Sequence, residues 1–156
     1  LIIVAAATLA AAASRAQVSA TWSAVGPPGG TITAVRANPA VAGAVYAGTA
    51  ENGIFYSADG GRNWAAASGG LAPSNDTGRQ QLYAVFALVS DGQYMYAATG
   101  SGLYYTAAAG SPQWLPLAGP TNAPRLTMLA YDAVTQRLFA ASDATDGEVA
   151  IAARSA

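Results

Sequence analysis

The sequence predicts an all-β chain made of repeated four-stranded antiparallel units, and three observations support this prediction. Aromatic residues recur at matching positions, each after an apolar residue and before Ala: Tyr46, Tyr96 and Phe139. A short apolar alternation with period two lies upstream of each aromatic, as half-buried strands require. Turn-forming residues join these segments in every copy. Recurrence of this kind is typical of a repeat architecture.

The composition is that of a folded chain with few charges. The 156 residues are 53% hydrophobic and 10% charged, which excludes a disordered chain. Seven Arg and no Lys balance eight acids to a formal net charge of -1. The Arg are scattered along the chain, so we expect no nucleic-acid partner. The sequence has no Cys and no His, which excludes disulfides, thiolate metal sites and the usual triads and zinc sites, and we predict no metal and no cofactor.

The first twenty residues have the pattern of an export signal. Residues 1–13 form an apolar run as long as a signal-peptide core and too short to cross a bilayer. Small residues follow at spacings that signal peptidase accepts, in Ser14-Arg15-Ala16 and Val18-Ser19-Ala20. We therefore predict a signal peptide with a truncated start over residues 1–20, no membrane span, and a secreted or periplasmic location. The alternative is an Ala-rich helix packed on the domain.

The folded part is expected over residues 21–156, and each unit begins with an apolar alternation that serves as its first strand. These first strands are expected at residues 32–35, 82–85 and 126–129. The second strand of each unit contains the recurring aromatic. The expected divisions are an orphan fourth strand at 22–25, units at 31–67 and 82–117, and a partial unit at 126–156.

Turn residues separate the strands within each unit. The second turn of each unit is a short-range hairpin signal, found as Asn52-Gly53, Ser101-Gly102 and Asp146-Gly147. The fourth strand is expected to start at Trp64 and at Trp114, each eighteen residues after its aromatic. The constant spacing indicates that the units are copies of one structure.

Four short antiparallel strands per unit, repeated every roughly 40 to 50 residues, are typical of β-propeller blades. The prediction is therefore a partial β-propeller of about two and a half to three four-stranded blades. Missing blades or self-association would be needed to cover its open sheet edges. A β-sandwich of the same strands is the alternative, but it does not explain the constant spacing between the aromatics and the Trp residues.

The segment 57–64, Ser-Ala-Asp-Gly-Gly-Arg-Asn-Trp, resembles the Asp-box or BNR repeat in full. Its pattern is a hydroxyl residue, any residue, Asp, any residue, Gly, two of any residue and an aromatic. The surrounding sequence resembles exported bacterial propellers of the sialidase-like, xyloglucanase-like, sortilin-like and photosystem II assembly-factor-like groups, over about residues 22–156. The second copy has Thr106 and Trp114, but Ala108 stands at the Asp position and one extra residue precedes the Trp.

In such families the box joins the third strand to the fourth, away from the ligand-binding face. The resemblance thus implies a structural role for Ser57, Asp59, Gly61 and Trp64. A short carboxylate such as Asp59 can accept hydrogen bonds from N–H groups of its own turn, and glycines allow the backbone angles that the turn needs. Trp64 is expected to bury its ring against the neighbouring blade. A catalytic, calcium-binding or ligand-binding role of Asp59 is the alternative.

The same resemblance places the ligand-binding rim at the other end of the blades. Its loops join the second strand to the third and the fourth strand to the next blade. The longest loop is the preferred candidate, because binding residues tend to lie on loops carried by a rigid frame, although an ordinary solvated loop is the alternative. The candidate ligand-binding residues are Glu51, Asn52, Asn75, Asp76, Arg79, Asp143 and Asp146.

The motifs favour a binding scaffold over an enzyme, and no catalytic residue is assigned. A glycosidase needs two carboxylates across the scissile bond, or a Tyr nucleophile in sialidase-like sites. Xyloglucanase-like families place a catalytic Asp directly after a Thr, where this chain has Ala50 between Thr49 and Glu51. The arginine cluster and Arg-Ile-Pro-type motif of sialidase-like sites are absent. We therefore expect a non-catalytic scaffold for a protein or polysaccharide ligand; the alternative is the N-terminal part of a sialidase-like or xyloglucanase-like glycoside hydrolase whose catalytic residues lie largely outside this chain.

Overall fold

The computed structural model describes residues 25–28, 30–73, 83–118, 126–142 and 149–153, the last of these as backbone only. The predicted signal segment 1–20 and all but Val25 of the orphan strand 22–25 lie outside these residues. The strands form three antiparallel sheets, in each of which sequence neighbours pair. The strands of the first sheet are β1 (Ile32–Ala37), β2 (Val45–Thr49), β3 (Ile54–Ser57) and β4 (Ala65–Ala66). Those of the second are β5 (Val85–Ser90), β6 (Tyr94–Thr99), β7 (Gly102–Ala107) and β8 (Leu115–Leu117), and those of the third are β9 (Leu126–Asp132), β10 (Arg137–Ser142) and β11 (Val149–Ala153).

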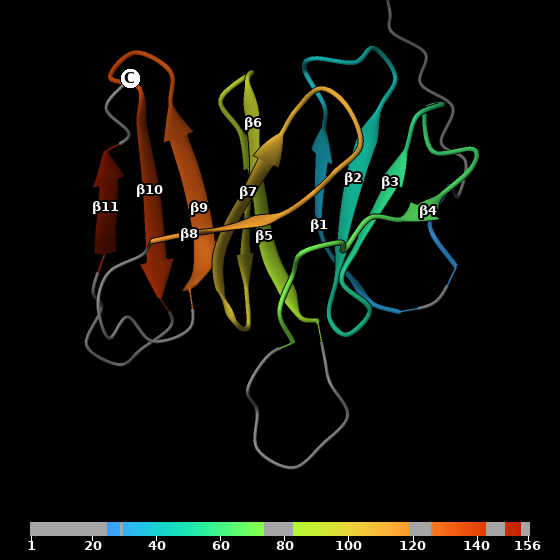
Figure 1. The fold of residues 1–156 in the computed structure, drawn as a ribbon, viewed down its shortest axis with the longest axis horizontal. Helices are drawn as coiled ribbons and strands as arrows, with labels where there is room; N and C mark the ends of the chain where they lie inside the picture. The colour runs from blue at the N-terminus through green and yellow to red at the C-terminus, as the bar shows by residue number, and fades with distance from the viewer. Residues whose placement is uncertain (1–24, 29, 74–82, 119–125, 143–148, 154–156) are drawn as a thin grey trace, which may run out of the picture.

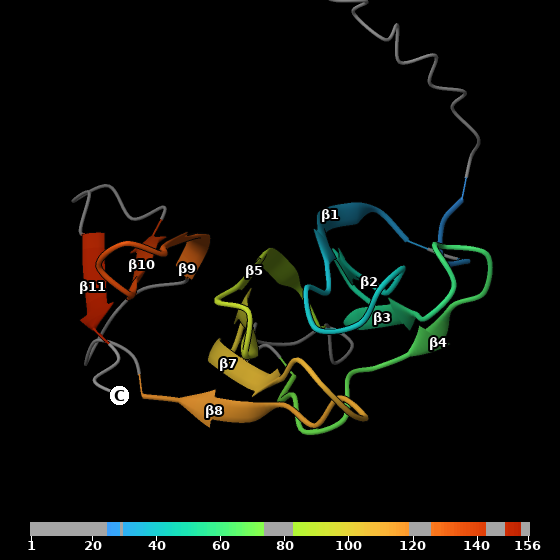
Figure 2. The same cartoon turned by 90° about the horizontal axis from the view of Figure 1, so that it is seen from above.

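The three sheets stand side by side as the blades of a partial propeller (Figure 1). The first strands of the blades are innermost: β1 contacts β5, and β5 contacts β9. Seen from above, the sheets follow an arc, with β4 and β8 on the side away from β1 and β5 (Figure 2). The prediction of an all-β partial propeller is confirmed.

The recurring aromatics lie on the second strands as predicted, but the first strand of the second blade was predicted in the wrong place. It was expected at residues 82–85, whereas β5 runs from Val85 to Ser90 and pairs with β6 up to Ser90 opposite Met95. Tyr83 instead forms a bridge with Asn52 of the first blade. The apolar alternation continues from residue 82 into the strand, so only pairing with β6 decides where the strand begins.

The fourth strands also begin slightly later than predicted. β4 starts at Ala65 and β8 at Leu115, so each follows its Trp by one residue. The blades also share a local feature: in each of them, the pairing of the first strand with the second contains one register irregularity. These irregularities lie between Ile32 and Ala34, between Val85 and Ala87, and opposite Ala141 and Ser142. Such bulges increase local twist and re-aim side chains at strand ends.

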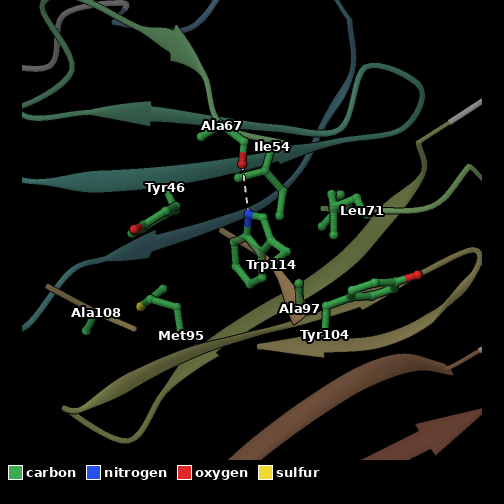
Figure 3. Close-up of a cluster of buried hydrophobic side chains, with 10 residues drawn as sticks. Tyr46, Ile54, Ala67, Leu71, Met95, Ala97, Tyr104, Ala108 and Trp114 are labelled. Atoms are coloured by element: carbon green, nitrogen blue, oxygen red, sulfur yellow. Dashed lines mark hydrogen bonds between the residues drawn. The ribbon is translucent and has the colours of Figure 1, made fainter. Parts of the chain in front are cut away.

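The hydrophobic core lies between the blades and forms two clusters. Trp114, which is 1% exposed, packs between the first two blades with Tyr46, Ile54 and Met95 (Figure 3). The second cluster joins the last two blades and includes Leu138. Burying one large aromatic ring removes roughly 150–250 Å² from water, worth about 4–6 kcal/mol as an upper estimate. The interfaces between blades therefore carry most of the stabilising burial.

Tyr46 is one of the most deeply buried side chains of the first interface. Its hydroxyl is buried and has no hydrogen-bond partner. Burial, assisted by the neighbouring Tyr56, raises the pKa of Tyr46 to about 12. The hydroxyl therefore stays protonated at neutral pH.

Candidate functional site

The loops of the blades gather at two opposite ends. Turns between first and second strands, and between third and fourth strands, lie at one end (top of Figure 1). The loops between second and third strands of the first two blades, and the described residues of the connection between these blades, lie at the other end (bottom of Figure 1). We call this second end the loop rim; its described part comprises residues 50–53, 72–73, 83–84 and 100–101.

The loop of the first blade at the rim is organised by Thr49, a residue that sequence reasoning did not select as functional. The Thr49 side chain is fully buried. Its Oγ1 donates a hydrogen bond to the Gly53 carbonyl at 2.9 Å and accepts one from the Asn52 N–H at 2.8 Å. Gly53 has a φ of 75°, and a Cβ there would lie 2.2 Å from Ser68 Oγ. The positive φ and the nearby Ser68 side chain therefore favour glycine at this position.

The same loop is tied to the chain on both sides. The Ala50 N–H donates to the Thr31 carbonyl at 2.9 Å, just before β1. On the other side, the Tyr83 N–H donates to the Glu51 carbonyl, and the Gly53 N–H donates to the Tyr83 carbonyl, both at 2.9 Å. Glu51 and Asn52 are exposed, so a rigid backbone presents their side chains to solvent.

The second blade repeats this arrangement with Thr99 in place of Thr49. Thr99 Oγ1 donates to the Gly102 carbonyl at 2.8 Å and accepts from the Ser101 N–H at 3.2 Å. The Gly100 N–H donates to the Ala84 carbonyl at 2.9 Å, as Ala50 does to Thr31. The signal was present in the sequence, because a Thr closes the second strand in both copies shortly before a Gly.

The rim also joins the second blade to the segment that follows the first. Ser101 Oγ donates to the Ala72 carbonyl at 2.7 Å, and the Ala72 N–H donates to the Tyr104 hydroxyl at 3.3 Å. These bonds fix the start of the longest loop at the rim. They join the loop of the second blade to the segment that follows the first blade.

Two of the predicted ligand-binding residues, Glu51 and Asn52, are described, and both lie on the rim. They lie on the loop between β2 and β3, as expected from the sequence, and their role in ligand binding stays a prediction. Among the four described acids, Glu51 alone lies there, since Asp59, Asp91 and Asp132 belong to turns at the opposite end. The other predicted ligand-binding residues, Asn75, Asp76, Arg79, Asp143 and Asp146, lie outside the described residues. In the described part of the chain, no group of three or more acids could hold a metal ion.

The Asp59 turn at the opposite end is a closed hydrogen-bond network. Ser57 Oγ donates to Asp59 Oδ1 at 2.8 Å and accepts from the Gly61 N–H at 2.8 Å. The Asn63 N–H and side-chain amide donate to the two Asp59 oxygens at 2.9 and 2.7 Å. These bonds, the backbone bond from Asn63 above all, lower the pKa of Asp59 to about 2. Every oxygen of the carboxylate is thus engaged within the turn itself.

The two Trp residues differ from the sequence expectation. Trp64, expected to bury its ring against a neighbouring blade, is only half-buried, and its Nε1 donates to Gly61 of its own turn at 2.9 Å. The expected contact is made by Trp114, whose Nε1 donates to the Ala67 carbonyl of the first blade at 2.8 Å (Figure 3). Its ring meets that of Tyr46 edge-on, with centroids 6.2 Å apart. Trp114 packs on the blade that precedes its own, whereas the described residues include no blade before that of Trp64, so the burial of Trp64 against a neighbour stays a prediction.

No helix in the described residues is long and apolar enough to cross a membrane. No protein-family model matches the chain, and no curated protein matches it. The chain is similar in structure to the GH74 xyloglucanase from Xanthomonas campestris, with a TM-score of 0.51 and 19% identity over 69% of this chain and 18% of that one. It is also similar to an ancestral GH74 enzyme, with a TM-score of 0.54 and 20% identity over 72% of this chain and 16% of that one. The chain thus spans less than a fifth of the length of either enzyme, and the likeness agrees with its architecture: an all-β partial β-propeller.

Proposed function

We propose that the protein is an exported, non-catalytic β-propeller scaffold that binds a polysaccharide or protein ligand at the loop rim. The observation that carries the proposal is the presentation of Glu51 and Asn52. Both side chains are exposed on a loop whose backbone is fixed by hydrogen bonds to Thr49, Thr31 and Tyr83. A preorganised polar pair loses little conformational freedom on binding, which favours affinity.

The chemistry of this pair suits ligands rich in hydroxyl or amide groups. The Glu51 carboxylate accepts hydrogen bonds, and the Asn52 amide both donates and accepts them. Sugar hydroxyls and peptide backbones offer the matching groups. One similar structure is named a xyloglucanase, which supports a polysaccharide as the ligand.

The binding surface is proposed to extend over the neighbouring loops of the rim. Asn75, Asp76 and Arg79 belong to the long loop between the first two blades, and Asp143 and Asp146 to the loop of the third. Polar residues on several adjacent loops would allow an extended ligand to cross more than one blade.

The second candidate is part of a glycoside hydrolase, and both GH74 likenesses favour it. Hydrolysis requires two carboxyl groups about 5–10 Å apart across the bond to be cleaved. The position after Thr49 holds Ala50, which has no carboxylate. Catalysis would then depend on acids supplied from elsewhere on the rim, with Glu51 as one partner.

We also propose that residues 57–64 are a true Asp-box and that the protein belongs to the BNR-repeat propellers. The closed network around Asp59 supports a structural role for Ser57, Asp59, Gly61 and Trp64. The proposed blades are 31–67, 82–117 and 126–156, after a signal peptide at 1–20 and an orphan strand at 22–25.

The test is a glycan array that includes xyloglucan oligosaccharides, followed by calorimetry on the ligands that bind. Replacing Glu51 by Ala, or Asn52 by Ala, is expected to weaken binding about tenfold each, since each removes hydrogen bonds to the ligand. The matched control is Asp132→Asn, which changes an acid at the opposite end and should leave affinity unchanged. Equal loss in the control, or no loss in either rim variant, would contradict the proposal.

Release of reducing sugar from xyloglucan separates the two candidates. The scaffold proposal expects none above a buffer blank. Release that disappears in Glu51→Gln would establish the hydrolase instead.

A further inference from the structure

Asn52-Gly53 is the one Asn-Gly pair of the sequence, and its chemistry makes Asn52 a site of covalent change. In deamidation the backbone nitrogen of the following residue loses its proton and bonds to the side-chain carbonyl carbon of the Asn. Ammonia leaves, and water opens the cyclic imide to Asp or isoaspartate. Glycine favours this ring closure because it has no Cβ to obstruct the approach of its nitrogen. An exposed Asn-Gly loop is therefore converted readily unless its backbone is held.

The nitrogen that would attack belongs to Gly53, and it is engaged in the folded chain. The Gly53 N–H donates a hydrogen bond to the Tyr83 carbonyl at 2.9 Å, and the Tyr83 N–H donates to the Glu51 carbonyl at the same distance. Gly53 is buried, although the Asn52 side chain is exposed. A base must reach and remove the Gly53 proton before the ring can close. The bridge to Tyr83 must therefore open first.

Thr49 holds the same dipeptide from the other side. Its Oγ1 accepts a hydrogen bond from the Asn52 N–H at 2.8 Å and donates one to the Gly53 carbonyl at 2.9 Å. The Thr49 N–H donates to the same carbonyl at 2.9 Å. The groups before and after the peptide bond that joins Asn52 to Gly53 are thus fixed. Ring closure rotates this peptide group toward the Asn52 side chain, so it opposes all these bonds.

We infer that Asn52 is a latent deamidation site, which the hydrogen bonds to Thr49 and Tyr83 keep in the amide form. When these bonds open, Asn52 becomes a carboxylate beside Glu51, and the rim gains a negative charge. Tyr83 belongs to the connection between the first two blades, so loosening of that connection leaves a permanent chemical mark on the rim. The inference concerns the chemistry of the loop and does not depend on ligand binding at the rim.

The first test follows the reaction in the purified wild-type chain, folded in buffer and unfolded in urea, at physiological pH and temperature. Trypsin releases residues 37–62 as one peptide, because it cleaves after Arg and the chain has no Lys. Mass spectrometry of this peptide reports Asn52 alone, since Asn38 precedes Pro39, which has no N–H to form the ring, and the peptide has no Gln. We expect conversion to be at least about tenfold slower in the folded chain.

The second test removes one clasp and keeps its shape. Thr49→Val replaces the hydroxyl by a methyl group, so it should accelerate conversion of Asn52 in the folded chain about tenfold. Hydrogen exchange of the Gly53 amide should accelerate with it, because both reactions need the open loop. The matched control is Thr99→Val, which removes the equivalent hydrogen bonds in the second blade and should leave the conversion of Asn52 unchanged. Far-UV circular dichroism verifies that both variants are folded.

Three results would overturn the inference. The first is conversion of Asn52 in the folded wild-type chain as fast as in urea, which needs no variant to observe. The second is equal acceleration by Thr49→Val and Thr99→Val, since the rate would then follow the stability of the whole chain and not the bonds of this loop. The third is a folded Thr49→Val variant that converts no faster than the wild type.

Discussion

The turns between the third and fourth strands of the first two blades are held by different hydrogen bonds. In the first blade, Asp59 accepts hydrogen bonds from the N–H and side-chain amide of Asn63 and from the hydroxyl of Ser57, all within its own turn. In the second blade Ala108 stands at the Asp position, and its carbonyl instead accepts a 2.6 Å hydrogen bond from Asn38 of the first blade. A turn that has lost its local carboxylate is thus held from the neighbouring sheet.

Trp64 and Trp114 differ in the same way, one bonding locally and the other to the neighbouring blade. Trp64 bonds within its own turn, whereas Trp114 bonds to Ala67 and packs on Tyr46 across the interface. The first-blade turn is thus held by its own residues, whereas the second-blade turn is also held by the first blade, which lies before it. Mutations in the first turn should therefore act locally, and those at Asn38 or Trp114 should weaken the contact between blades.

The largest expected effect is that of Trp114→Ala. Trp114 is 1% exposed, so its removal leaves a cavity between blades and an unpaired Ala67 carbonyl. We expect a loss of about 3–5 kcal/mol in the free energy of unfolding, against about 1–2 kcal/mol for the half-buried Trp64→Ala. Urea denaturation followed by circular dichroism measures both. Equal losses would remove the distinction between the two turns.

Asn38→Ala should have the next largest effect. Asn38 is 5% exposed, and its loss leaves the buried Ala108 carbonyl without this donor and removes the bond from the Ala40 N–H to Oδ1. We expect about 2 kcal/mol of destabilisation, because an unsatisfied buried polar group costs more than a solvated one. The matched control is Asn63→Ala in the exposed first turn, which should cost less than about 1 kcal/mol. A control that costs as much as Asn38→Ala would contradict support from the neighbouring blade.

The smallest effect is the acid sensitivity of the first turn. The pKa of Asp59 is lowered to about 2 in the folded protein, below its ordinary value of 3.8. The ionised form is therefore favoured by folding, and its contribution is present above pH 4 and lost as the pH falls from about 4 to about 2. Thermal unfolding midpoints of wild type and Asp59→Asn across this range measure it. The two curves should converge at low pH, and parallel curves would show that the carboxylate does not stabilise the turn.

Most of the fold followed from the spacing of a few residues. The aromatics at Tyr46, Tyr96 and Phe139 mark the second strands because each copy repeats the same alternation around them. The start of β5 was missed, since apolar residues continue on both sides of it and pairing with β6 sets its limits. Local pattern specifies that a strand exists, and long-range pairing specifies where it begins.

The sequence predicted at which end of the blades the candidate site lies, but not how its loop is held. The Asn52-Gly53 hairpin signal placed Glu51 and Asn52 on a loop between the second and third strands, where they lie. The role of Thr49 was not predictable from this motif alone, because its hydroxyl organises the loop through the Gly53 carbonyl, and a buried Thr at a strand end otherwise reads as an ordinary core residue. The bond from Asn38 to the Ala108 carbonyl was not predictable either, because the two residues lie 70 positions apart in the sequence.

The outermost strands of the first two blades bear on how these two sheets avoid adding further strands. β8 contains Pro116 at its centre, which has no N–H to offer an added strand, and β4 is only two residues long. Short or proline-bearing edges resist the strand-by-strand growth of amyloid. The peripheral edges of the first two blades therefore offer an incoming strand few backbone groups with which to pair.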